Sequence, residues 1–152
     1  MNKKFKTKID QLPRLFDQLA DSEPKIRTNL ANLPQKGVYA FFERSRPMYV
    51  GRSNRMKDRI MEHGRPKSDR YNATFAFRLA IEEAEKKGID VNKPCAELEK
   101  DPSFAEVFSE EKKRVSQMQI RTVEVNDSLE QTLFEIYASV AFNTKYNDFT
   151  TH

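Results

Sequence analysis

The sequence is poor in the residues that build disulfide scaffolds, linkers and membrane spans. Its 152 residues include one cysteine, four glycines and seven prolines. A single cysteine, Cys95, cannot form an internal disulfide, which is typical of a reducing compartment. The low glycine and proline content excludes a linker, a collagen-like rod and a low-complexity chain. No run of about 18 apolar residues occurs, so we expect no transmembrane helix.

A secretory signal is also lacking. The first sixteen residues begin with basic side chains but contain no continuous apolar stretch of the kind that a signal peptide requires. Together with the lone cysteine, this predicts a cytoplasmic protein that does not act at a membrane.

The chain is instead rich in charge and in phenylalanine. Charged residues make up 33% of it and hydrophobic residues 38%, and 11 Phe and 5 Tyr can fill a modest core. This length predicts one domain, at most with an appendage, that folds without disulfide or metal staples.

The charge is distributed unevenly. Residues 36–70 carry ten basic and four acidic side chains, whereas residues 82–111 carry ten acidic side chains and four lysines. A positive segment suits an anionic partner, because nucleic-acid binding depends first on neutralising phosphates. The alternative interpretation is a pair of solvated faces without a binding role, and the formal net charge of +4 does not decide between them.

The apolar pattern predicts a small α/β domain of the α+β type, a three-stranded antiparallel sheet flanked by helices. The expected strands are residues 37–43, 48–51 and 119–125, of which the first two form a hairpin. The expected helices are residues 8–21 (with Pro13 as an alternative start), 23–33, Ser53 or Asn54 to His63, 73–87, 94–117 with a break at Asp101-Pro102, and Asp127 or Ser128 to Ala141.

Buried faces are predicted for two of these helices. Met56 and Ile60 form the buried i, i+4 pair of the helix that ends near His63. The inward stripe of the last helix is expected to be Leu129, Leu133, Ile136 and Val140. Glu135 lies well away from this stripe on a helical wheel, so periodicity alone predicts an ordinary exposed glutamate.

Six short elements follow one another in the order of a nuclease signature. They are Gly37-Val38-Tyr39, then Tyr49-Val50-Gly51 ten residues on, Arg59, His63, Leu133-Phe134-Glu135 and Tyr146-Asn147. The series resembles the GIY-YIG nuclease domain family over roughly residues 35–65 and 118–148. Valine replaces isoleucine in both tripeptides, which keeps a β-branched strand residue. Thr144 stands near the place of a common family proline, which predicts a less rigid loop.

The resemblance implies a metal-dependent endonuclease that hydrolyses phosphodiester bonds in nucleic acid, with DNA as the expected substrate. The implied catalytic residues are Tyr39, Tyr49, Arg59, His63, Glu135 and Asn147. It nominates Tyr39 as general base, Arg59 as ligand of the scissile phosphate, and Glu135 as ligand of one divalent cation, Mg²⁺ or another such as Mn²⁺. His63 would relay a proton or contact phosphate, and Asn147 would shape the site.

The residue types suit this chemistry. A phenol of pKa ~10 is a poor base at neutral pH unless positive charge favours the phenolate. A guanidinium matches phosphate oxygens in a bidentate way, and Mg²⁺ bound by one carboxylate completes its shell with water and phosphate oxygens. The residues expected to contact nucleic acid are Arg52, Arg55, Lys57, Arg65, Lys67 and Arg70.

A shared site makes a demand on the hairpin. Tyr39 and Tyr49 must face the same side of the sheet, which an odd register provides, for example with Phe42 opposite Met48. Pairing Glu43 with Met48, without a compensating bulge, would separate the two phenols.

The predicted organisation is a helical extension at 1–34, a nuclease-like domain at 35–148 with a helical insertion at about 64–117, and a tail at 149–152. The insertion is expected to help choose the substrate and offers a surface for a homodimer or a partner protein.

Several alternatives stay open. Glu130 lies nearer the edge of the apolar stripe than Glu135 does, and Asn143 is the rival of Asn147. The rival functions are a nucleic-acid-binding module of the same fold that does not cleave, and a protein-interaction adaptor that uses the acidic helices 73–87 and 94–117.

Overall fold

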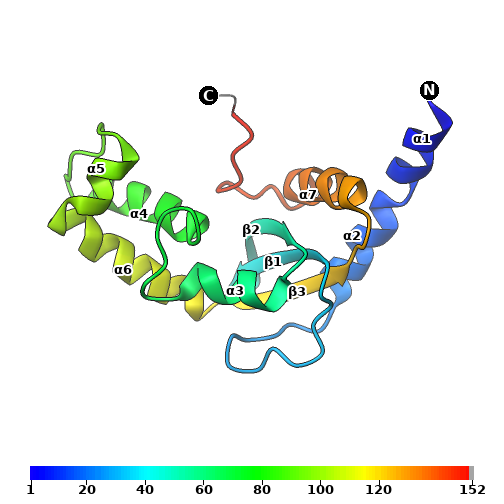
Figure 1. Cartoon of the computed structure of the whole chain (residues 1–152), viewed down its shortest axis with the longest axis horizontal. Helices are drawn as coiled ribbons and strands as arrows, with labels where there is room; N and C mark the ends of the chain where they lie inside the picture. The colour runs from blue at the N-terminus through cyan, green and yellow to red at the C-terminus, as the bar shows by residue number, and fades with distance from the viewer. Residues whose placement is uncertain (151–152) are drawn as a thin grey trace. The chain divides into compact units, whose positions relative to one another are not determined.

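A computed structural model describes residues 1–150 and contains a three-stranded antiparallel sheet (Figure 1). The strands are β1 Gly37–Glu43, β2 Arg46–Ser53 and β3 Gln119–Glu124, in the order β2-β1-β3. All three predicted strands are confirmed, and β2 is longer than predicted at both ends. The last two positions of the predicted tail, Thr151 and His152, lie outside the described residues.

The helices divide between two compact units. The helices are α1 Lys3–Asp10, α2 Leu12–Asp21, α3 Met56–Gly64, α4 Thr74–Lys86, α5 Cys95–Lys100, α6 Pro102–Ser116 and α7 Ser128–Phe142. The first unit combines residues 1–57 with the chain from residue 118 onward, and the second is residues 58–117. Within residues 1–150, no helix has the length and apolar character that crossing a bilayer requires.

In the first unit, α2 and α7 pack against one face of the sheet, and Figure 1 shows α7 in orange beside β2. Val38 and Ala40 point to this face because alternate residues of a strand share a side. They meet Leu19 of α2 together with Phe134 and Ala138 of α7, all of which are buried. The core therefore joins segments from both ends of the chain.

The helix predicted over residues 8–21 is two helices that meet at Gln11. Pro13 lies in the first turn of α2, where the missing N–H leaves no helical hydrogen bond unmade. The alternative start at Pro13 is therefore close to the observed one.

Residues 23–33 form no helix, so that prediction is wrong. Lys25 forms an antiparallel bridge with Ile120 of β3, and its N–H and C=O each exchange a 2.8 Å hydrogen bond with that residue. Pairing with a strand almost a hundred positions away overrides the local helical tendency.

In the second unit, α4 and α6 pack side by side around an aromatic cluster. Phe77 contacts Phe104 and Phe108 with ring centroids 5.2 and 5.3 Å apart, both edge to face. The break predicted at Asp101-Pro102 is confirmed, since the Asp101 carboxylate accepts the backbone N–H of Ser103 and caps α6.

A buried lysine holds the loop that joins α3 to α4. Lys112 of α6 is almost fully buried, and its Nζ donates to the carbonyls of Pro66 at 2.6 Å and Ser68 at 2.9 Å. Burial lowers the pKa of Lys112, against the opposing influence of Glu99 and Asp69. The ammonium thus replaces water as the partner of this loop's backbone.

Candidate active site

The turn of the β1–β2 hairpin differs from the expected one. It consists of Arg44-Ser45, both with a left-handed backbone (φ 51° and 67°), and it closes with Glu43 opposite Arg46. The expected pairing of Phe42 with Met48 is therefore wrong. Continued along the strands, this even register would place the two candidate phenols on opposite faces.

A β-bulge restores the shared face. The register shifts between Phe41 and Phe42, which leaves Met48 as the extra residue of β2 and pairs Phe41 with Tyr49. Tyr39 lies two positions from Phe41 and so projects to the same side as Tyr49. The expectation that both tyrosines share one face is confirmed, by way of the bulge.

The two glycines of the motif, Gly37 and Gly51, lie where a larger side chain would clash. A Cβ placed on Gly51 would lie within 2.8 Å of Oη, Cζ and Cε2 of Tyr39, so the phenol lies across this glycine. A Cβ on Gly37 would overlap the carbonyl oxygen of Val123 on β3. Gly51 therefore gives room to the phenol of the first tripeptide, and Gly37 allows β1 and β3 to approach. Tyr39 is 1% exposed.

Glu135 of α7 forms an ion pair with Arg52 of β2. One carboxylate oxygen lies 3.6 Å from Nε of Arg52, and the Glu135 side chain is 23% exposed. Burial raises the pKa of Glu135, while the Arg52 guanidinium acts in the opposite direction. The helical-wheel expectation of an ordinary exposed glutamate is wrong.

Of the predicted inward stripe of α7, Leu133 packs against the core as expected, but the other three residues are wrong. Leu129, Ile136 and Val140 are exposed, the last by 73%. The helix instead buries Gln131, Phe134, Ala138 and Ser139. Gln131 can face inward because its amide donates to the carbonyl of Val125 at 2.7 Å and to Asn54 at 2.9 Å.

Asn147 binds the middle residue of the second tripeptide. Its Oδ1 accepts the N–H of Val50 at 2.9 Å, and its Nδ2 donates to the Val50 carbonyl at 2.7 Å. The buried Thr144 hydroxyl donates to Asn147 at 2.8 Å and so connects this loop to the asparagine. Asn143, the rival candidate, ends α7 in the left-handed conformation (φ 55°).

The sheet register separates two groups of candidates. Arg52 pairs with Val38 and so projects to the face that α2 and α7 cover, where it meets Glu135. Tyr39 and Tyr49 project from the other face. Since β2 is an edge strand, the two groups lie on either side of one strand at the rim of the sheet.

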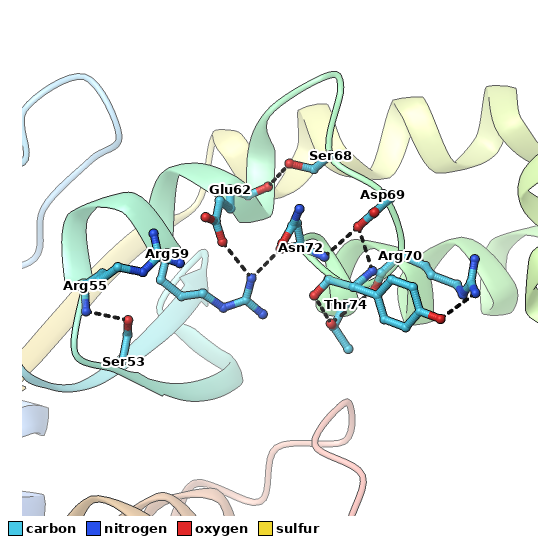
Figure 2. A network of polar contacts seen from close by, with 10 residues as sticks. Ser53, Arg55, Arg59, Glu62, Ser68, Asp69, Arg70, Asn72 and Thr74 are labelled. Atoms are coloured by element: carbon cyan, nitrogen blue, oxygen red, sulfur yellow. Dashed lines mark hydrogen bonds and ion pairs between the residues drawn. The ribbon is translucent and has the colours of Figure 1, made fainter. Parts of the chain in front are cut away.

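Arg59 and His63 belong to the second unit. The Arg59 guanidinium donates to the Glu62 carboxylate at 3.1 Å and to the Asn72 carbonyl at 2.7 Å, as Figure 2 shows. His63 is fully buried, and burial together with the Arg59 charge lowers its pKa well below the usual value. The imidazole is therefore neutral at pH 7 and brings no positive charge to a phosphate.

The remaining predicted nucleic-acid contacts are of two kinds. The exposed ones are Arg52, Arg55, Lys57, Arg65 and Lys67. Arg70 is half-buried, and its guanidinium donates to Glu99 at 2.6 Å and to the Tyr71 hydroxyl at 2.6 Å. Arg70 is therefore already committed within its own unit.

Metal binding at Glu135 would rest on one protein carboxylate. Across residues 1–150, no three His, Cys, Asp or Glu side chains come together as a metal-binding group. A hard divalent cation that retains water fits such a donor better than zinc, which takes several protein ligands.

No family model matches the chain, and neither a curated protein nor a solved structure is significantly similar to it.

Proposed function

We propose that this protein is a metal-dependent endonuclease of the GIY-YIG type that hydrolyses phosphodiester bonds in nucleic acid, with DNA as the expected substrate. The observation that carries the proposal is the Arg52–Glu135 pair, a partly buried carboxylate 3.6 Å from a guanidinium that directly follows Tyr49-Val50-Gly51. Burying a carboxylate costs stability, and such groups gather at functional sites. The order of the sequence motifs supports the same assignment.

Tyr39 is the proposed general base. Packing across Gly51 fixes the orientation of its phenol, and nearby positive charge would favour the phenolate. Tyr49 is the second phenol on that face. Because Tyr39 is 1% exposed in the unliganded chain, cleavage requires that this face becomes accessible when substrate binds.

Glu135 is the proposed ligand of the divalent cation. When bound, Mg²⁺ or Mn²⁺ would stabilise the negative charge that develops on the leaving oxygen. Arg52 is 45% exposed and can turn toward a phosphate when the carboxylate changes partner. Asn147 is a positioning residue, since it holds Val50 rather than a substrate.

Arg59 is the proposed ligand of the scissile phosphate, for which its guanidinium would exchange the Glu62 carboxylate and the Asn72 carbonyl. Further phosphates would be neutralised by the exposed basic side chains. Their contribution is electrostatic and independent of sequence, so binding should weaken steeply with salt. His63 is neutral and buried, which limits it to a hydrogen bond or a proton transfer inside the protein.

A nucleic-acid-binding module that does not cleave is the second candidate. The observation in its favour is that Glu135 and the two phenols lie on opposite sides of β2, with Tyr39 buried. Binding needs only the exposed cations, whereas hydrolysis needs the carboxylate and a phenol to act on one phosphate.

Plasmid nicking separates the two functions. The wild-type protein, Glu135→Gln and Glu130→Gln are incubated with supercoiled plasmid in Mg²⁺ and again in EDTA. Glu130 is the matched control, because it lies on the same helix and pairs with Lys8 at 3.8 Å. Nicking that needs Mg²⁺ and is lost only in Glu135→Gln supports the endonuclease.

Other outcomes are equally informative. Loss in Glu130→Gln alone would show that the wrong glutamate has been assigned. Salt-sensitive binding without nicking favours the binding module. Absence of both nicking and binding would contradict both functions, and the protein-interaction adaptor would be the remaining hypothesis.

A further inference from the structure

The loop between α3 and α4 presents an exposed aromatic side chain. Tyr71 is 67% exposed, although a tyrosine would ordinarily bury most of its ring. The guanidinium carbon of Arg70 lies 4.3 Å from the ring centroid, and Arg70 also donates to the phenol oxygen. Glu99 holds Arg70 in turn at 2.6 Å. The ring is therefore supported by a cation and open to solvent over most of its surface.

The backbone around Tyr71 is fixed by several independent contacts. The Asp69 carboxylate accepts the N–H groups of Tyr71 and Asn72, each at 3.0 Å, and Figure 2 shows Asp69 facing Asn72. Arg59 binds the Asn72 carbonyl, and Lys112 binds the other end of the loop at Pro66 and Ser68. A loop that is already ordered loses little conformational freedom when a ligand binds.

The charges of the loop favour an anionic ligand. Arg65 and Lys67 are exposed, whereas the negative charge of Asp69 is engaged by backbone N–H groups and that of Glu99 by Arg70. The loop therefore offers two cations and one rigid aromatic ring.

We infer that Tyr71 is a stacking platform for an unpaired base, and that the protein therefore prefers single-stranded or branched nucleic acid to uninterrupted duplex. This inference rests on the proposed nucleic-acid function. Every base has a π-face, so stacking on tyrosine is tolerant of sequence. The faces of bases in a duplex are covered by their neighbours, which leaves only unpaired bases for Tyr71. Arg65 and Lys67 neutralise the adjacent phosphates.

The chain contains no tryptophan, which allows a direct test. Tyr71→Trp introduces a single tryptophan, and its emission is followed while a 12-nucleotide oligo(dT), a blunt 12-bp duplex or the duplex with a 3′ single-stranded flap is added in EDTA. Fluorescence anisotropy of labelled oligonucleotides reports binding independently. We expect quenching by the single strand and the flap, and none by the blunt duplex.

Affinity measurements complete the test. Tyr71→Ala should weaken binding of oligo(dT) and the flap about 5- to 150-fold and change duplex binding less than twofold, whereas Tyr71→Phe retains affinity. Phe149→Ala, which removes another exposed aromatic ring, is the matched control and should change nothing. Arg65→Ala or Lys67→Ala should instead reduce the slope of log affinity against log salt concentration by about the amount of one phosphate contact.

The outcomes separate the inference from the proposed function. Anisotropy that shows binding, with tryptophan emission unchanged and Tyr71→Ala unaffected, would overturn the stacking role alone. Equal losses on duplex and single strand would overturn the preference for unpaired bases. If no oligonucleotide binds, both the stacking inference and the proposed nucleic-acid function are overturned.

Discussion

Replacing Gly51 by alanine tests the contact between the two tripeptides. The added Cβ would lie within 2.8 Å of three Tyr39 atoms, whereas ordinary contacts begin near 3.4 Å, so the phenol must move. Tyr39 is fully buried, and overpacking of this kind costs about 1–3 kcal/mol. The reduced freedom of the unfolded chain returns about 0.4–1 kcal/mol. From the middle of each range, we therefore expect Gly51→Ala to lower the free energy of unfolding by about 1.3 kcal/mol.

The same displacement should affect cleavage more strongly. A shift of about 1 Å in a catalytic group can reduce the rate about 100-fold. Urea denaturation gives the stability, and plasmid nicking at a temperature where the variant is folded gives the activity. Gly88→Ala is the control, because Gly88 has a positive φ of 77° and open space around it. That variant should lose stability through backbone strain but keep its activity.

A double-mutant cycle identifies the cause. If Gly51→Ala acts through the Tyr39 ring, its cost should shrink in a Tyr39→Leu background, because the atoms nearest the new methyl group are gone. Equal costs in the two backgrounds would refute this reasoning. Wild-type stability in the single variant would refute it as well.

Three further predictions concern side chains whose environment the structure defines. Glu135→Gln should unfold at the same or a higher temperature at pH 7, since burial raises the Glu135 pKa and its charge costs stability, and Mg²⁺ should raise the melting temperature of the wild type only. Burial lowers the pKa of His63, so its neutral form contributes fully to the free energy of unfolding above pH ~6.5, and this contribution is lost as the pH falls below that value. Urea titrations from pH 5 to 8 should show a weaker pH dependence of the free energy of unfolding in His63→Gln. Asn147→Ala should cost about 1–3 kcal/mol in urea, with faster amide exchange at Val50, because both backbone groups lose their partner.

Sequence reasoning succeeded where the signal is local. The alternation of residues in the strands is a local pattern, and so are the helix caps. Asp127 accepts the N–H of Glu130 at the start of α7, as an acidic residue before an apolar helix predicts. Met56 and Ile60 are both buried because their i, i+4 spacing places them on one face of α3.

Prediction from sequence failed where contacts between distant segments determine the local structure. The bridge between Lys25 and Ile120 replaced a predicted helix, and no pattern near Lys25 announces it. The predicted inward face of α7 was wrong because Gln131 is buried with polar partners, and a prediction from apolar spacing does not consider such residues. The candidate residues themselves could be named from motif order. The bulge at Met48 and the Arg52–Glu135 pair needed coordinates.

The Asn147 amide occupies hydrogen-bonding groups at an edge of the sheet. An edge strand normally offers unpaired N–H and C=O groups to which a strand of another molecule can add. On β2, these two groups of Val50 are occupied by a side chain from the last residues of the chain, and on β3 those of Ile120 are occupied by Lys25. Shortening the chain before Asn147 would open one edge, so aggregation by strand addition is the expected failure of such a truncated protein.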